Sequence, residues 1–161
     1  MLANRILKAS GTLVAERGAT GPIVSRMFKA HVRTYRLTRG LIGHRVPGMP
    51  PFLLLQHVGA KSGITRTTPL GYVRDGDNVV LIASKGGGPS NPAWFHNLRA
   101  NPDVMIQVGP KQTTVRAHVA DADERSRLWP IFLELDQIFA EYQQRTDREL
   151  PLVVLEPRAA T

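Results

Sequence analysis

The sequence predicts an α+β protein in which antiparallel strands form a small barrel with flanking helices. Residues 1–45 repeat their apolar side chains with a helical period, whereas the period changes to two from Phe52 onward. The turn sequences Asp75-Gly76-Asp77 and Gly109-Pro110 each separate two such alternating runs, as in β-hairpins. Few helices are inserted between the strands, which favours an antiparallel barrel over an alternating βαβ fold. We therefore expect a basic helical segment over residues 1–45 and a barrel domain over residues 46–161.

The first segment repeats apolar residues at four-residue spacing, and most of its arginines lie off the resulting stripe. The apolar residues are Leu2, Ile6, Ile23, Met27, Val24 and Phe28, with Val32 and Tyr35 continuing the stripe. Two interpretations fit this pattern: a surface helix with a solvated charged face, or an amphipathic segment that contacts anionic lipid. The proline-rich run over residues 46–51 ends the segment.

The remaining elements follow from turn and capping signals. We expect strands at residues 52–58, 69–74, 78–83, 104–108, 113–119 and 152–155. A short helix should begin with Asn91 as its N-cap and Pro92 at its first position, and end at Asn101-Pro102. A longer helix should begin at a capping box of Asp121 and Glu124 and run to about residue 144, with a kink or break at Pro130.

Composition limits the compartment and the chemistry. The chain has no cysteine, so it has no disulfide and no thiolate nucleophile. The net charge of +8 is uneven, because residues 1–66 hold 11 lysines and arginines against the single acid Glu16. This asymmetry points to an anionic partner: nucleic acid, a membrane surface or a multiply charged small molecule.

No apolar run is long enough to span a bilayer and no signal-peptide core is present. We expect a cytoplasmic protein that can also contact the inner face of the membrane peripherally.

The usual catalytic motifs are missing. The five histidines show no metal-ligand spacing, and there is no G-x-S-x-G motif. These absences disfavour a zinc enzyme or a hydrolase. The stretch GAKSGITRTTPLGYV resembles a phosphate-binding loop, but Ala60 replaces the glycine that a Walker loop needs before its lysine, and a strand pattern follows instead of a helix.

Three clusters carry chemistry. The turn with Lys61, Ser62 and Arg66 has glycines on both sides, so its amide groups can point at an anion; the alternative is a charged turn in water. The run Ala83-Ser84-Lys85-Gly86 begins a glycine-rich loop at a strand end, or is simply flexible. Trp94 and Asn97 lie one helical turn apart, although a lone tryptophan is more often part of the core. Together these clusters could hold a flat ring at one end and a phosphorylated, acidic tail at the other.

The runs GAKSGITRTTPLGYVRDGD and VVLIASKGGGPSNPAWFHNLRANPDV, with the later Thr146-Asp147-Arg148, resemble the deazaflavin (F420)-dependent nitroreductase family. The resemblance covers roughly residues 45–157 and implies a split β-barrel fold. It also implies a reductase that binds the reduced cofactor F420 and passes a hydride to nitroimidazoles, quinones or other conjugated small-molecule acceptors. No nucleic-acid partner is expected, and the oligomeric state is left open.

The resemblance implies roles for individual residues. The phosphate and glutamyl tail of F420 would contact the turn, and the deazaflavin ring would lie near Pro69, the glycine-rich loop, Trp94 and Asn97. The expected cofactor-binding residues are Leu54, Leu55, Gln56, Ala60, Lys61, Ser62, Gly63, Ile64, Thr65, Arg66, Pro69, Ala83, Ser84, Lys85, Gly86, Trp94 and Asn97. Ser84 and Tyr142 are the candidate catalytic residues, and Phe139 and Trp94 are expected to contact the acceptor.

The sequence departs from the family at Phe139, where a substrate-facing tyrosine is expected. A phenylalanine cannot donate a hydrogen bond to a nitro group or a carbonyl. Three alternatives to an F420-dependent reductase stay open: an F420 carrier without turnover, an FMN-binding relative on the same barrel, and a nucleic-acid-binding protein that uses the basic N-terminal half.

Overall fold

The computed structural model describes residues 22–47 and 49–158, so the earlier part of the predicted N-terminal segment lies outside the described residues. It confirms the α+β class. The elements are α2 (Pro22–Leu37), β1 (Phe52–Val58), β2 (Thr65–Gly71), β3 (Val73–Asp75), β4 (Asn78–Ile82), the 3₁₀ turn η1 (Lys85–Gly87), α3 (Ala93–Ala100), β5 (Asp103–Val108), β6 (Lys111–Val119), α4 (Ala122–Leu135), α5 (Ile138–Gln144) and β7 (Leu152–Pro157).

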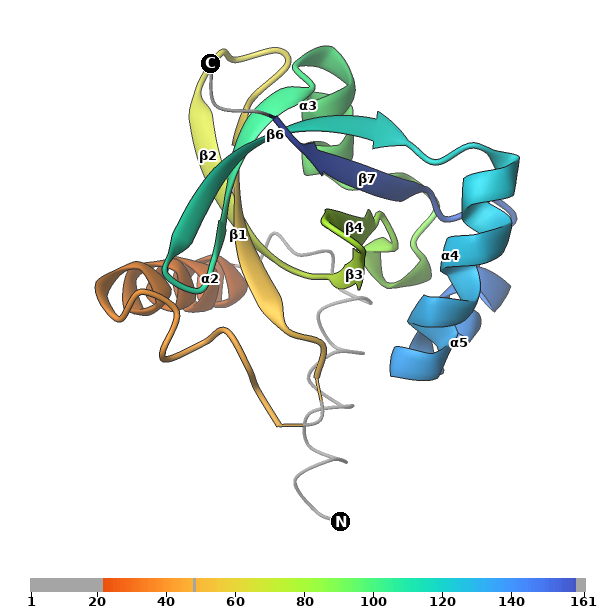
Figure 1. Cartoon of the computed structure of the whole chain (residues 1–161), viewed down its shortest axis with the longest axis horizontal. Helices are drawn as coiled ribbons and strands as arrows, with labels where there is room; N and C mark the ends of the chain where they lie inside the picture. Colours follow the sequence, from red (N-terminus) through yellow and green to blue (C-terminus); the bar gives the residue numbers. More distant parts are fainter. Residues whose placement is uncertain (1–21, 48, 159–161) are drawn as a thin grey trace.

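The strands form one antiparallel sheet of seven strands in the order β2-β1-β5-β6-β7-β4-β3. Its two edge strands, β2 and β3, are consecutive in the chain and are joined by Tyr72 alone. Because one residue cannot cross the width of a flat sheet, the sheet must curl until its edges approach each other. Figure 1 shows the resulting half-barrel, with α2 on one side and the α4–α5 pair on the other.

Two groups of apolar side chains hold this arrangement together. The larger group fills the barrel and includes Leu53, Leu55, Leu81 and Val115, with Trp94 and Phe95 of α3 packed into it. The smaller group joins the far side of β4 and β7 to α4 through Leu128 and Phe132. Both faces of these central strands are therefore buried, which accounts for their nearly continuous apolar sequence.

Helix α2 packs against the barrel mainly through Tyr35, whereas Phe28 of the predicted stripe is 40% exposed. Tyr35 is fully buried, and its hydroxyl donates to the carbonyl of Phe52 (3.0 Å) and accepts from the amide of Gly109 (2.8 Å). In the next turn of chain Gly40 lies against Gly109, where a Cβ on Gly40 would come within 2.5 Å of the Gly109 Cα. Ile23 and Met27 are instead exposed.

The domain boundary at residue 45 stays a prediction, and so does membrane contact by this segment. No helix among the described residues has the length and apolarity needed to cross a bilayer.

The structure corrects several predicted boundaries. Strand β2 begins at Thr65 rather than Pro69, because the β-branched threonines that follow the turn pair with β1 from Val58↔Thr65 onward. The first helix ends at Leu37 rather than near residue 45, and Pro92, not Asn91, is the N-cap of α3.

The predicted late helix breaks at a different residue from the one expected. Pro130 lies inside α4, and the break falls at Asp136, whose backbone is extended and whose side chain accepts from the amide of Ile138 (3.0 Å). The capping box of Asp121 and Glu124 is confirmed.

Candidate functional site

The turn between β1 and β2 is a closed loop with its polar groups outward. The amide of Gly59 donates to the carbonyl of Ile64 (2.9 Å), and the amide of Gly63 donates back to the carbonyl of Gly59 (2.8 Å). Gly63 has a φ of +65°, and a Cβ on Gly59 would collide with the hydroxyl of Ser62. The positive φ therefore favours glycine at position 63, whereas a side chain at position 59 would only require the Ser62 hydroxyl to turn away.

The exposed positions of this turn can bind an anion. Lys61 and Ser62 are exposed, and within residues 22–47 and 49–158 their amides donate to no protein acceptor. Successive free amides beside a lysine and a hydroxyl form the concave donor set that suits phosphate or carboxylate groups. The residues present therefore fit the charged tail of F420.

A buried polar chain holds the turn from beneath. The side-chain oxygen of Asn97 accepts from the amide of Ala60 (2.9 Å), which directs the Asn97 NH₂ group toward Nδ1 of His57 (2.9 Å). Nδ1 is then the acceptor, so the His57 proton lies on Nε2 and is donated to the Thr68 hydroxyl (3.0 Å). Burial and the nearby Arg66 guanidinium lower the pKa of His57, which keeps the ring in this neutral form.

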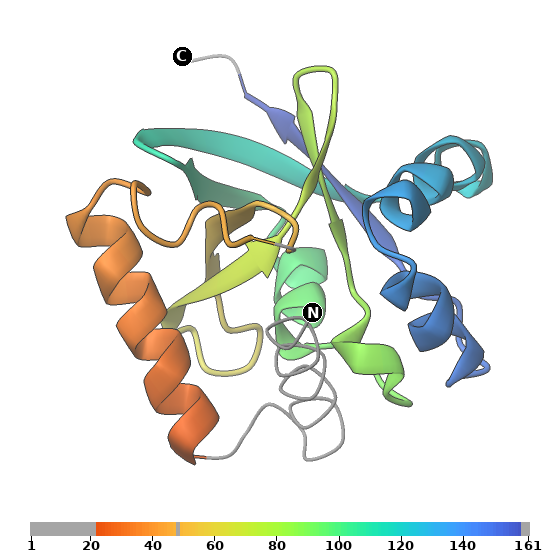
Figure 2. The same ribbon diagram turned by 90° about the horizontal axis from the view of Figure 1, so that it is seen from below.

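The glycine-rich loop lies at the same end of the barrel as the turn, with α3 between them (Figure 2). Lys85, Gly86 and Gly87 all have positive φ angles, of 47°, 65° and 78°. A Cβ on Gly87 would lie 2.5 Å from the carbonyl oxygen of Tyr142, so the loop and α5 touch backbone to backbone. The hydroxyl of Ser84 makes no capping hydrogen bond to η1 and so is not used in holding the loop's helical turn.

Arg148 fastens this loop, and the sequence reasoning assigned it no role. Its Nε donates to the carbonyl of Gly88 (2.9 Å), and its terminal nitrogens donate to the carbonyls of Ala83 (3.2 and 3.3 Å) and Ser84 (2.8 Å) and to the side chain of Asn91 (2.6 Å). Burial lowers the pKa of the guanidinium, which nonetheless remains charged. The quoted Thr146-Asp147-Arg148 motif was the available signal, but only the fold reveals what its arginine touches.

The two aromatic residues of α5 lie beside the loop. Phe139 packs edge-to-face against Phe132 of α4 (5.5 Å between ring centres) and against Tyr142 (6.2 Å). Tyr142 is partly buried, with the Arg145 guanidinium over its ring at 5.5 Å. Burial raises the pKa of the Tyr142 phenol, so this group is a hydrogen-bond donor at neutral pH.

The other predicted site residues lie in three environments. Leu55 and Trp94 point into the barrel core, where Trp94 is 6% exposed. Leu54 and Gln56 lie on the opposite face of β1, beside Thr67 of β2 and Arg36 of α2. Pro69 is buried and pairs with Leu54. Ile64, Thr65 and Arg66 are exposed at the end of the turn.

Fold and site together define a split-barrel protein with an anion-binding turn next to an arginine-fastened glycine-rich loop. Residues 27–157 match the family described as F420H(2)-dependent quinone reductase. An F420H(2)-dependent quinone reductase of Mycobacterium tuberculosis is 48% identical over 136 residues, which cover 83% of this chain and 91% of that protein. The chain therefore belongs to the F420H(2)-dependent quinone reductase family and is an F420-dependent reductase.

Solved structures agree with this assignment. One described as an F420-H2 dependent reductase (FDR-A) superposes with a TM-score of 0.61 at 38% identity, covering 66% of this chain and 94% of the other. Another, described as a domain-swapped dimer, gives a TM-score of 0.63 at 34% identity, covering 79% and 96% of the two chains. The predicted split barrel, the cofactor F420 and the reductase activity are thereby confirmed.

Proposed function

We propose that the chain reduces quinone-like acceptors with F420H2, holding the cofactor's charged tail on the 59–66 turn and its ring beside the 83–88 loop. The observation that carries this proposal is the arrangement of two segments around α3. They are a donor-rich turn held by Asn97 and a glycine-rich loop held by Arg148. The reduced deazaflavin supplies the hydride when bound. All other contributions come from the protein.

The protein's contributions are position and hydrogen bonding. The Lys61 ammonium, the Ser62 hydroxyl and the free amides of these two residues would orient the tail. Arg66 would add a second cation at the start of β2. An acceptor that takes up hydride develops negative charge on an oxygen, and a nearby donor stabilises that charge. Tyr142 keeps its phenolic proton at neutral pH, as a phenol ordinarily does, and burial raises its pKa further. Ser84 offers a hydroxyl that does not cap η1.

The acceptor class follows from Phe139. Its phenyl ring adds apolar surface beside Tyr142 and offers no hydrogen bond, so a flat quinone ring is favoured over a nitro group. This proposal extends to the chain what the name of the mycobacterial relative says of that protein.

Two measurements test the proposal. Fluorescence titration of cofactor-free protein should show tighter binding of F420 than of FMN, with an affinity that weakens as salt rises. Lys61→Ala should weaken F420 binding by about 1–3 kcal/mol, the range for a charge-assisted hydrogen bond, whereas Lys111→Ala on the distant β5–β6 hairpin should not. Steady-state oxidation of F420H2 by menadione should then demonstrate turnover.

The outcomes separate the alternatives. Binding of F420 without oxidation by any quinone would favour a carrier. Equal, salt-insensitive affinity for F420 and FMN would count against the tail-binding role of the turn. A mobility shift on random DNA that persists at physiological salt would favour the nucleic-acid reading.

A further inference from the structure

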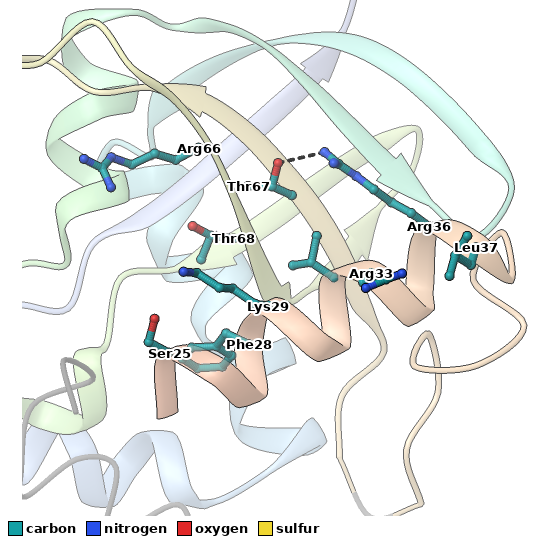
Figure 3. Close-up of a pocket in the computed structure, with 10 residues that line it drawn as sticks. Ser25, Phe28, Lys29, Arg33, Arg36, Leu37, Arg66, Thr67 and Thr68 are labelled. Carbon is teal, nitrogen blue, oxygen red and sulfur yellow. Dashed lines mark hydrogen bonds between the residues drawn. The ribbon is translucent and has the colours of Figure 1, made fainter. Parts of the chain in front are cut away.

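Two hollows of the molecule lie in different places. Figure 3 shows the one between α2 and β2, whose wall includes Arg66 of the 59–66 turn, so it belongs to the site already described. The other, of about 340 Å³, lies between α3 and β6, which pack against each other (Figure 1). None of the residues assigned to the cofactor or to the acceptor lines this α3–β6 cavity.

The floor of the α3–β6 cavity is apolar. Six of its nine lining residues carry hydrocarbon side chains: Phe95, Leu98, Pro102, Ala117, Val119 and Val153. Positions 115, 117 and 119 share one face of β6, and the methyl group of Ala117 occupies less space beneath α3 than the valines on either side would. The amide of Ala117 donates to the carbonyl of Pro102 (2.9 Å). A ligand on this floor therefore meets mainly carbon surface.

The rim of the cavity holds one cation that is open to a ligand. The three polar lining residues are Arg99, Arg116 and His118. Nη1 of Arg116 pairs with Asp103 (2.9 Å), and Nε2 of His118 pairs with Glu124 (3.0 Å). Arg99 is exposed in the last turn of α3 and forms no ion pair within residues 22–47 and 49–158. Its guanidinium is therefore available to an anion.

The two carboxylates near this rim are already bonded elsewhere. The second oxygen of Asp103 accepts from Nη1 of Arg158 (2.7 Å). Glu124 accepts from the amide of Asp121 (3.1 Å) in the capping box as well as pairing with His118. Neither carboxylate is free to neutralise Arg99, so a single positive charge stands at the edge of an apolar floor.

We propose that the α3–β6 cavity binds an apolar monocarboxylate, such as a medium-chain fatty acid, with its hydrocarbon part on the floor and its carboxylate on Arg99. A guanidinium matches a carboxylate with two parallel hydrogen bonds. A polyanion would leave charge against carbon surface, and a neutral apolar molecule would gain nothing from Arg99. The volume lies within the range of small-molecule sites, about 300–1,000 Å³. This inference is independent of the proposed function.

The test uses the full chain with F420 added, and two probes of equal length, octanoate and octanol. Methyl-resolved NMR titration should shift the signals of Leu98, Val119 and Val153 first. The dissociation constant for octanoate should be about fivefold lower than that for octanol, the upper end for an exposed ion pair. In Arg99→Ala the ratio of the two constants should fall to about one. The control Arg26→Ala removes the same charge from an exposed residue that does not line the cavity, and it should keep the wild-type ratio.

A second variant fills the cavity instead of removing its charge. Val119 is 44% exposed, so Val119→Trp can place an indole in the opening without disturbing the core. Octanoate should then no longer shift the Leu98 and Val153 signals, while F420 titration should give the wild-type affinity.

Each contrary outcome contradicts a stated part of the proposal. Unshifted Leu98, Val119 and Val153 signals at saturating octanoate, or shifts that persist in Val119→Trp, would show that the cavity is not the binding site. Equal affinity for octanoate and octanol, or the same ratio in Arg99→Ala as in the wild type, would overturn the role of Arg99. Weakened F420 binding by Val119→Trp would mean that the cavity is part of the cofactor site and not a separate one.

Discussion

At the scale of single residues, His57 links the anion-binding turn to pH. Its neutral ring accepts from Asn97 and donates to Thr68, and a proton on Nδ1 would place two donors against each other. Because the folded pKa lies below the unfolded value of 6.5, the unfolded chain binds protons first as the pH falls. Stability is therefore fully present above about pH 6.5 and is lost as the pH falls toward the folded pKa. Burial also lowers the pKa of His31, so this residue contributes in the same direction.

We predict that the free energy of unfolding decreases as the pH is lowered below about 6.5. His57 should contribute up to about 1.4 kcal/mol of this decrease per pH unit. His57→Gln can keep both hydrogen bonds without titrating, so its stability should fall less steeply. Urea unfolding at three pH values between 5.5 and 7.5 measures both slopes, and identical slopes would show that His57 is not a titrating contributor.

Position 139 should set the acceptor preference. Phe139→Tyr adds a donor beside Tyr142 and should raise nitroimidazole reduction relative to menadione reduction, since one well-placed donor is worth about 2.7–4 kcal/mol of barrier. Steady-state rates with both acceptors give the ratio, and an unfolding curve controls for disturbed packing against Phe132. A wild type that reduces both acceptors equally fast would refute the role of this residue.

At the scale of elements, the contact between the glycine-rich loop and α5 depends on Gly87. Gly87→Ala meets two penalties, a positive φ of 78° and a contact with the Tyr142 carbonyl. Gly76→Ala is the matched control, because Gly76 also has a positive φ, of 60°, but a Cβ there meets nothing within 4 Å. We expect Gly76→Ala to cost about 1 kcal/mol of stability. Gly87→Ala should cost more and also reduce activity, since it displaces α5 from the loop. Equal costs and unchanged turnover would show that the loop tolerates that displacement.

The elements were predictable from sequence wherever a local signal sufficed. The capping box, the Asp75-Gly76-Asp77 hairpin and the limits of β1 each depend on a few neighbouring residues, and each is confirmed. The predicted start of β2 was wrong because Thr65 is held in the strand by its pairing with Val58. That pairing cannot be recognised from the residues next to Thr65 alone. The bonds from Arg148 to residues 83–91 span some sixty positions, so no spacing rule could find them.

At the scale of the whole molecule, α2 and the barrel should unfold as one unit, because the buried Tyr35 hydroxyl bonds the helix to Phe52 and Gly109, beside the bond from Arg36 to Thr67. Tyr35→Phe removes this hydroxyl and leaves the Gly109 amide and the Phe52 carbonyl without it. We predict a loss of about 1–3 kcal/mol in the free energy of unfolding. Far-UV circular dichroism and tryptophan fluorescence should give coincident transitions in the wild type. An earlier loss of helical signal would mean that α2 is an independent segment.

The strand order has a consequence for how the protein is made. Strand β7 follows the other six described strands in the chain, yet it lies between β6 and β4 in the sheet. Until β7 leaves the ribosome, the β3–β4 hairpin has no neighbour in the sheet, and the half of the barrel that begins with β2 cannot join it. Arg148, which fastens the glycine-rich loop, emerges only a few residues earlier. A nascent chain can therefore shape the 59–66 turn early, but it acquires the fastened loop only after Arg148 has emerged. The turn and the loop of the proposed cofactor site are thus completed at different times, and the half of the sheet next to the loop depends on β7.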